Sequence, residues 1–448
     1  MKRMFSNIAI LLAFTVSCFA TDVQELVKHC VEEGYTKGMA VAVIDENGID
    51  YYSYGHLSDE SKVSVDENTL FEIGSVTKTI TGLLLQIMIE KGEMDLNDPL
   101  EMYLPSYVKV PQYKNKKILL KHLANHTAGF PYMPTNFESE DMGNPFAGYT
   151  EEYLYDFLSN FEPPRAPGKV HEYSNISVGL LGFIISKKVG MPYEQLVREW
   201  ILEPLQMNST YVNVPESETY RFAKGHVGDA QVSNWDIPVL EGAGALKSCV
   251  ADLARYVQAN MDLIESDFSD AFKLMHKRTC RTKMPYIGMT LTFNDYIKFR
   301  PRVIWHNGGT GGYHSFIGFC PKTKKGVVIL SNSITYIDDL GFHLLNEKHA
   351  FSSERKEICL NPILLKKYEG LYEHISGVRV AFAVNAGLLQ AKSKLIGPIA
   401  VPIYPESDVR FFAKKVTADV DFELDREGNP AGFFVIYGNQ KFWMKKIQ

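Results

Sequence analysis

The chain has 448 residues, of which 45% are hydrophobic and 22% are charged, and its formal net charge is −6 at pH 7. At roughly 150 residues per domain this length favours two domains, and the composition is that of a globular protein with ample material for a core. A mildly acidic chain without a dense Lys/Arg block argues against binding to nucleic acid or to an anionic membrane surface.

The first twenty residues, MKRMFSNIAILLAFTVSCFA, have the pattern of a secretory signal peptide. Lys2 and Arg3 form a basic head, an apolar stretch follows, and cleavage is expected after Ala20. The apolar stretch is too short to cross a bilayer as a helix. Cleavage would leave 45 basic and 53 acidic residues, a formal charge of −8. We therefore expect an exported protein, periplasmic or secreted, with a lipoprotein carrying its lipid on Cys18 as the second choice.

The cysteines give no sign of a metal site. Five of the six would remain after cleavage, and none forms a close CxxC pair, so zinc binding is not supported. An exported protein can form disulfides, but the spacing indicates no pairing. The six are Cys18, Cys30, Cys249, Cys280, Cys320 and Cys359.

The N-terminal part of the mature chain predicts helix, hairpin and helix in turn. Residues 21–34 have helical apolar spacing and stop at a glycine, and residues 38–58 read as two strands joined at Asn47-Gly48. Residues 75–91 predict a helix ended by Gly92. Apolar residues cover most of its circumference, so we expect it to be buried in a core.

Strands return after a long middle region. Residues 95–235 mix helices with loops rich in Pro, Gly and Asn, residues 302–333 read as strands with a turn at 322–326, and residues 337–351 read as a helix. This order predicts an α+β fold, an α/β sandwich with an antiparallel sheet flanked by helices and an inserted all-helical subdomain.

A charged, irregular segment at 351–361 reads as a linker. Beyond it, residues 362–448 contain short alternating strands separated by glycines, the pattern of a small, barrel-like all-β domain. We therefore expect a signal peptide at 1–20, a main domain at 21–350, the linker, and this second domain.

The strongest chemical signal is Ser75 and Lys78 in FEIGSVTKTITG, at the head of the apolar helix. Positions i and i+3 share a helix face, so the Lys amine can reach the Ser oxygen. Burial disfavours the charged amine, which can then take the serine proton and make Ser75 a nucleophile. The same spacing recurs at Ser106 and Lys109, but prolines flank that copy and predict a solvated loop.

A second candidate is Tyr173 with Asn175, directly before the apolar stretch ISVGLLGFIISKKVG. A Tyr beside a Lys ammonium can have its pKa lowered and relay a proton, and the Asn amide can orient a substrate carbonyl. Taken alone, a Tyr that simply packs with its hydroxyl hydrogen-bonded is the commoner case.

The third candidate is WHNGGTGG, residues 305–312, on a predicted strand. Glycines weaken a strand unless something approaches its backbone closely, and an extended substrate is one such partner. A phosphate-binding loop would need a following helix and a Lys-Ser/Thr pair, and neither is present.

Together, Ser75-Val76-Thr77-Lys78, Tyr173-Ser174-Asn175 and His306-Asn307-Gly308 resemble the three active-site elements of the serine β-lactamase and penicillin-binding protein superfamily. The Tyr-x-Asn element resembles the class C β-lactamase branch, with its DD-peptidase, D-aminopeptidase and esterase relatives. LKHLANHTAGFP and GAGALKSCVADLARYV also resemble stretches of that branch, so the likeness covers about residues 22–350. The tail resembles, more weakly, a small lipocalin-like domain.

The resemblance implies a β-lactamase/transpeptidase-like fold and a role for each residue. Ser75 would form an acyl-enzyme while Lys78 and Tyr173 share the proton transfers. The N–H groups of Ser75 and Gly309 would form the oxyanion hole. No metal or cofactor is implied. The substrate-binding residues would be Asn175, His306, Asn307 and Gly308.

One departure from the resemblance bears on the substrate. Class C β-lactamases carry Lys-Thr-Gly where this chain has His306-Asn307-Gly308. Histidine is largely neutral near pH 7, so the fixed positive charge facing a substrate carboxylate is reduced. The sequence therefore predicts an exported serine hydrolase for D-amino-acid peptides or esters, with β-lactams as further candidates. The alternative is a catalytically silent, penicillin-binding-like regulatory protein of the cell envelope.

Overall fold

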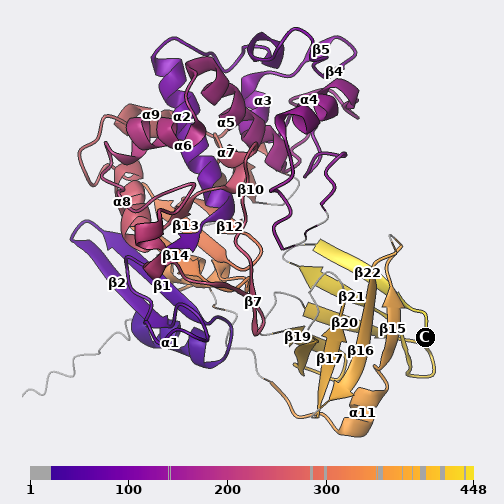
Figure 1. Cartoon of the computed structure of the whole chain (residues 1–448). Helices are drawn as coiled ribbons and strands as arrows, with labels where there is room; N and C mark the ends of the chain where they lie inside the picture. Colours follow the sequence, from indigo (N-terminus) through magenta and orange to yellow (C-terminus); the bar gives the residue numbers. More distant parts are fainter. Residues whose placement is uncertain are drawn as a thin grey trace, which may run out of the picture.

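The computed structural model describes most of the chain in two bodies, a helix–sheet body and a β-barrel (Figure 1). The signal peptide predicted at 1–20 and residues 352–356 of the predicted linker lie outside the described residues. The described residues are 22–139, 141, 143–282, 286–296, 300–349, 351, 357–375, 377–385, 387–393, 400–413, 419–437 and 440–448.

The helix–sheet body is built on an antiparallel sheet of eight strands in the order β2-β1-β14-β13-β12-β11-β10-β9. The predicted hairpin forms β1 and β2, which pair from Gly38↔Gly55 to Asp45↔Gly48. Every residue of β13 is buried, as expected for a central strand that is covered on both faces. The strands are β1 (Gly38–Asp45), β2 (Gly48–Gly55), β9 (Cys280–Arg281), β10 (Ile287–Met289), β11 (Asn294–Tyr296), β12 (Val303–Gly309), β13 (His314–Cys320) and β14 (Lys325–Ser331).

The chain leaves the sheet after β2 and returns to it at β9, and most of the longer elements between them are helices. This insertion and one face of the sheet share the largest hydrophobic core, which contains the buried side of α2. Residues Thr77 to Met88 of α2 are all buried, as its apolar sequence predicts. Its helices are α2 (Thr77–Glu90), α3 (Leu120–Ala124), α4 (Glu151–Asn160), α5 (Asn175–Val189), α6 (Tyr193–Val197), α7 (Glu241–Gly244), α8 (Val250–Asn260) and α9 (Ser269–Met275).

Short turns and two-stranded ribbons link these helices. The strand β3 pairs with β8 just before the predicted nucleophile, with Phe71 opposite Ser248. The second Ser-x-x-Lys copy, at Ser106 and Lys109, lies in an exposed loop as predicted. The short elements are β3 (Phe71–Glu72), η1 (Gly74–Val76), η2 (Leu100–Tyr103), β4 (Gln112–Tyr113), β5 (Lys116–Lys117), η3 (Arg198–Leu202), η4 (Glu216–Arg221), β6 (Gly225–Val227), β7 (Ala230–Val232) and β8 (Lys247–Ser248).

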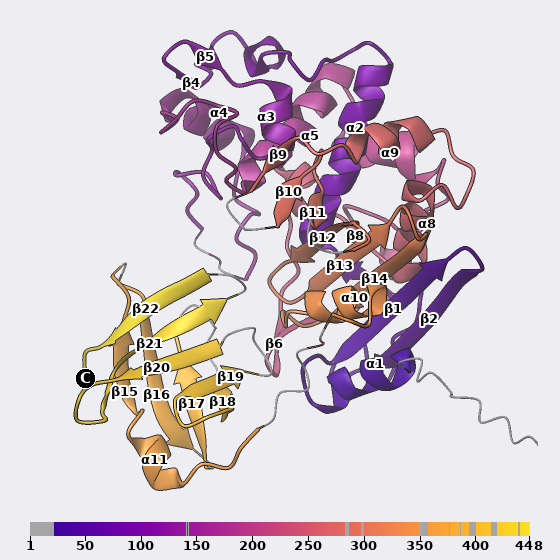
Figure 2. The same ribbon diagram turned by 180° about the vertical axis from the view of Figure 1, so that it is seen from behind.

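Two helices cover the opposite face of the sheet. Figure 2 shows α10 (Asp338–Leu345) in front of β13 and β14, and α1 (Val23–Glu32) beside β1 and β2. A second hydrophobic cluster, which includes Trp305, Phe316 and Phe342, fills the space beneath them. The predicted sandwich of a sheet between helices is therefore confirmed.

The C-terminal region forms a closed antiparallel barrel of eight strands in sequence order, in which β15 also pairs with β22. The predicted small, barrel-like all-β domain is therefore confirmed, and the short helix α11 (Pro362–Lys366) precedes its first strand. Its likeness to lipocalins stays a prediction. The strands are β15 (Gly370–Glu373), β16 (Arg379–Asn385), β17 (Leu388–Lys392), β18 (Val401–Pro405), β19 (Arg410–Ala413), β20 (Asp419–Leu424), β21 (Pro430–Tyr437) and β22 (Gln440–Lys446).

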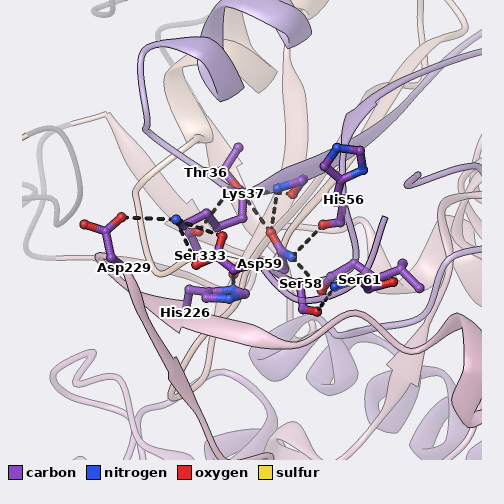
Figure 3. A network of polar contacts seen from close by, with 12 residues as sticks. Thr36, Lys37, His56, Ser58, Asp59, Ser61, His226, Asp229 and Ser333 are labelled. Atoms are coloured by element: carbon purple, nitrogen blue, oxygen red, sulfur yellow. Dashed lines mark hydrogen bonds and ion pairs between the residues drawn. The ribbon is translucent and has the colours of Figure 1, made fainter. Parts of the chain in front are cut away.

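A polar network fastens the β6–β7 hairpin to the edge of the body (Figure 3). Lys37 Nζ donates to Asp59 and to Asp229, each at 3.1 Å. His226 Nδ1 lies 3.2 Å from the carbonyl oxygen of Asn332, whose side-chain oxygen accepts the Gly38 N–H at 2.7 Å. Both carboxylates are more than half exposed, so these ion pairs contribute little to stability. We assign this network a structural role.

Two further findings concern membranes and cysteines. Within the described part of the chain, no helix combines the length and apolarity needed to cross a bilayer. The five described cysteines are free thiols, and Cys30, Cys249 and Cys320 are buried.

Candidate active site

The predicted nucleophile lies where β3 turns into the apolar helix. The helix begins later than expected, because Gly74–Val76 form a 3₁₀ turn before α2. Gly74 has φ +46°, and a Cβ there would lie 2.9 Å from the backbone nitrogen of Gly309. Only glycine therefore fits this turn against β12. The result is a half-buried Ser75 at the mouth of a rigid helix.

Lys78 lies one turn further on and is completely buried, with 0% of its surface exposed. Its Nζ lies 2.8 Å from Ser75 Oγ, 2.7 Å from Asn175 Oδ1 and 2.6 Å from the carbonyl oxygen of Ala243. Burial holds the pKa of Lys78 well below its ordinary value. The predicted pair is thus brought together, and the amine is shifted towards its neutral form.

The partners of Lys78 also decide where its lone pair points. The Ala243 carbonyl and Asn175 Oδ1 can only accept hydrogen bonds. A neutral amine satisfies both with its two N–H groups, which leaves its lone pair for the third partner. That partner is the Ser75 hydroxyl, the one group of the three that carries a proton to give. The site therefore has the geometry of a general base and its nucleophile.

Tyr173 and Asn175 stand at the head of α5, whose N-cap Ser174 accepts the N–H of Ser177 at 3.2 Å. The Tyr173 hydroxyl is hydrogen-bonded to the Ser75 side chain, and burial raises the pKa of Tyr173. The expectation that a lysine ammonium lowers this pKa is therefore wrong. Lys78 Nζ does lie 5.0 Å from the centre of the Tyr173 ring, but burial dominates both groups and pushes their pKa values apart. Burial thus shifts both groups towards their neutral forms, which for Lys78 is the form that can accept a proton.

The third element, on β12, places its residues on alternate faces of the strand. His306 faces the site, with its ring 6.3 Å from that of Tyr173. Its Nδ1 lies 2.6 Å from the carbonyl oxygen of Asn307 and so donates to it. Burial lowers the pKa of His306 to about 3. The ring is therefore neutral, as expected, and brings no fixed positive charge to the site.

Asn307 is not where the sequence placed it. Its side chain lies on the other face of β12, where Nδ2 donates to Asp338 Oδ2 at 2.7 Å. Because neighbouring residues of a strand point to opposite faces, His306 and Asn307 cannot both direct their side chains to the substrate. Asn307 faces the helix α10 instead.

Gly308 and Gly309 bring the backbone of β12 against the nucleophile. A Cβ at Gly308 would lie 2.1 Å from the Ile73 carbonyl oxygen and 2.9 Å from the Ser75 nitrogen, which explains the glycine within this strand. The backbone nitrogens of Ser75 and Gly309 consequently lie on neighbouring segments. Two such N–H groups are the donors that an oxyanion hole requires.

Two contributors to the site were not identified from the sequence. The Ala243 carbonyl comes from GAGAL, a stretch noted only for its resemblance, and a backbone acceptor leaves no side-chain signal. His126 comes from NHTAG and is fully buried, with its ring 4.5 Å from that of Tyr173. Among the described residues, no group of three or more His, Cys, Asp or Glu side chains is arranged to hold a metal ion.

Comparison with known proteins shows the family to which the chain belongs. The Beta-lactamase family model matches residues 23–344. A β-lactamase of Escherichia coli (strain K12) is 30% identical over 369 residues, which cover 73% of this chain and 95% of that protein. The D-alanyl-D-alanine-carboxypeptidase/endopeptidase AmpH of the same organism is 28% identical over 330 residues, or 70% of this chain and 84% of AmpH.

Solved structures show the same fold. A class C β-lactamase, 25% identical, aligns with a TM-score of 0.64 over 74% of this chain and 96% of its own. The octameric penicillin-binding protein homologue from Pyrococcus abyssi, 21% identical, aligns with a TM-score of 0.65 over 94% of this chain and 99% of its own. That second likeness is one of fold, and its coverage includes the barrel. With the family model spanning the whole helix–sheet body, the chain belongs to the β-lactamase family and is a serine hydrolase.

Proposed function

We propose that this protein is an exported hydrolase that cleaves amide or ester bonds through an acyl-enzyme on Ser75. The observation that carries the proposal is the 2.8 Å contact between Lys78 Nζ and Ser75 Oγ. It joins a half-buried hydroxyl to a buried amine whose other partners are both acceptors. We also propose the domain boundaries, with residues 21–350 as the hydrolase domain, 351–361 as the linker and 362–448 as a separate domain.

The reaction follows from the contacts. Lys78 takes the Ser75 proton while Oγ bonds to the substrate carbonyl carbon, and the carbonyl oxygen becomes an oxyanion held by the N–H groups of Ser75 and Gly309. When the oxyanion collapses, the bond to the leaving amine or alkoxide breaks. The leaving group takes the proton from the Lys78 ammonium, with the Tyr173 hydroxyl as the relay. Water then attacks the acyl group by the same steps and restores Ser75.

D-amino-acid peptides and esters are the proposed substrates, with β-lactams as further candidates. The similarity to AmpH, named as a D-alanyl-D-alanine-carboxypeptidase/endopeptidase, supports the peptide side. The neutral, buried His306 supports a weak hold on a substrate carboxylate, because a neutral imidazole offers no charge to pair with it. His306 and Gly308 remain the proposed substrate-binding groups of β12. Asn175 is proposed to hold the substrate amide through Nδ2, which in this structure contacts the Met133 sulfur at 3.5 Å.

The test is labelling of Ser75 followed by a comparison of substrates. We expect a fluorophosphonate or a fluorescent penicillin to label the wild-type protein and Ser75→Ala to abolish the label, since the acyl bond forms on Oγ. Ser106→Ala, at the other Ser-x-x-Lys copy, is the matched control and should label like wild type. Rates on a short-chain ester, a D-Ala-D-Ala peptide and a chromogenic cephalosporin then rank the substrates. A wild-type protein that neither labels nor hydrolyses the ester would instead support a silent, penicillin-binding-like protein.

A further inference from the structure

We propose that His126 is a positioning residue for Tyr173, which it holds in register with Ser75 through the ring contact and the backbone on either side of the tyrosine. The inference rests on the catalytic role of Tyr173 in the proposed function. His126 lies in the loop after α3, about 50 residues before Tyr173 in the chain, and no step of the reaction above uses it.

Three contacts tie this one histidine to three consecutive residues. The Glu172 N–H donates to the His126 carbonyl oxygen at 2.8 Å. The Ser174 N–H donates to His126 Nδ1 at 3.2 Å. Between them, the His126 and Tyr173 rings lie 4.5 Å apart at an interplanar angle of 31°. His126 therefore holds the N–H groups of the residues before and after Tyr173 and also contacts its ring.

Neighbouring bonds extend the same contact along both loops. The Gly168 N–H donates to the Thr127 carbonyl at 2.8 Å, and the Asn175 N–H donates to the Tyr132 carbonyl at 3.0 Å. The Tyr173 segment thus lies along a support made by residues 126–132. Within this support, His126 is the residue whose side chain contacts the Tyr173 ring and also accepts from the segment's backbone.

His126 combines a left-handed backbone conformation with a buried imidazole. Its φ is +57°, in the left-handed region, which few residues other than glycine enter, with asparagine, aspartate and histidine the commonest among them. The imidazole is also fully buried, and within the described part of the chain its Nε2 has no hydrogen-bond partner. Both features cost stability. The favourable contacts of this imidazole are the ring contact with Tyr173 and the hydrogen bond from the Ser174 N–H.

The proposal predicts that His126 acts only through Tyr173, and a double-mutant cycle tests this. The variants are His126→Asn, Tyr173→Phe and the double variant, assayed for kcat and KM on a short-chain ester. Asparagine tolerates the backbone conformation and keeps an acceptor near Ser174, so it removes mainly the ring. We expect His126→Asn to lower kcat about 10- to 100-fold, the effect of a misplaced catalytic group, with KM changed less than about threefold.

The decisive comparison is made without the tyrosine hydroxyl. In the Tyr173→Phe background, His126→Asn should change kcat by less than about threefold, because the group that it positions is gone. An equal loss of kcat in both backgrounds would show that His126 only supports the fold, and the proposal would fall. A Tyr173→Phe variant with wild-type kcat would overturn the catalytic role of Tyr173 and the inference with it, whereas Ser75 labelling would still report the acyl-enzyme separately.

A neighbouring histidine supplies the control. His122 Nδ1 accepts the Leu119 N–H at 3.1 Å at the start of α3, so His122→Asn should alter stability without depending on Tyr173. Thermal melts of every variant separate lost folding from lost positioning. Should His126→Asn not fold, His126→Gln removes the same ring and completes the same cycle.

Discussion

At the scale of single residues, Lys78 sets the chemistry and also carries a cost. A completely buried amine with a strongly lowered pKa binds its proton less readily in the folded protein than in the unfolded chain. Between the folded pKa and about 10.4, the unfolded state therefore holds more protons, and stability rises with pH. Lys78 thus makes the protein less stable at neutral pH than at alkaline pH, in exchange for a base that is ready to act.

This gives a prediction for the pH dependence of stability. The free energy of unfolding of wild type, compared with that of Lys78→Met, should rise as pH increases from neutral towards 10, by at most about 1.4 kcal/mol per pH unit. Urea unfolding at several pH values measures the difference. The exposed Lys62→Met should differ from wild type by a constant amount over the same range. A flat difference for Lys78→Met would show that its pKa in the folded protein is not lowered.

At the scale of elements, the strand β12 carries function on one face and support on the other. His306 and Gly308 meet the site, while Asn307 donates to Asp338 at the start of α10. Asp338 is completely buried, and its second oxygen lies 2.9 Å from Nε2 of His314 on the neighbouring strand. One carboxylate therefore fastens β12, β13 and α10 together behind the backbone that supplies the Gly309 N–H.

We predict that Asp338→Asn lowers the free energy of unfolding by roughly 1 to 3 kcal/mol, the cost of a buried polar group without its partner. An amide has one accepting oxygen, so either Asn307 Nδ2 or the His314 ring would face an N–H₂ group instead. Chemical unfolding measures the change. Asp50→Asn, on the exposed edge strand β2, is the matched control and should stay within about 0.5 kcal/mol of wild type. If the two variants were equally stable, Asp338 would not be the group that fastens β12, β13 and α10 together.

At the scale of the whole molecule, aromatic side chains fill the barrel, and the candidate active site lies in the helix–sheet body. The interior of the barrel is occupied by aromatic side chains, with Phe422 within 6.0 Å, centre to centre, of Tyr368, Tyr372, Phe382 and Phe433. Eight strands enclose a space that side chains can fill. The described interior is therefore a packed core, and the candidate active-site contacts that the structure describes all come from residues of the helix–sheet body.

Phe422→Ala should lower the stability of the barrel by roughly 3 to 5 kcal/mol, because it removes a buried aromatic ring from this core. Labelling of Ser75 should persist, since no residue of the barrel contributes to the proposed catalytic contacts. Limited proteolysis and thermal unfolding report the first effect, and fluorophosphonate labelling reports the second. Phe442→Ala, where 39% of the side chain is exposed, is the control and should change little. If the barrel unfolded and the labelling of Ser75 were lost as well, the helix–sheet body would depend on the barrel.

Local patterns in the sequence were enough to predict most of the elements and to pair Ser75 with Lys78. The period of the apolar residues predicted the helix from 75 to 91, the hairpin from 38 to 58 and the strands from 302 to 333, because these patterns depend on local geometry. Ser75 and Lys78 could be paired for the same reason, since one helical turn separates them. Lys78 was also expected to lose part of its preference for the charged form, because an amine at the start of an apolar helix is buried.

Features that depend on contacts between distant parts of the chain became visible only in the tertiary structure. The pKa of Tyr173 is raised rather than lowered, because several elements together bury its hydroxyl, and no local pattern reports that burial. The Asn307 side chain lies outside the site because it is on the side of β12 that faces the helix α10. The Ala243 carbonyl and the His126 ring reach the site across long stretches of chain. A backbone acceptor and a ring stacked on a distant tyrosine acquire their meaning only when folding brings their partners to them.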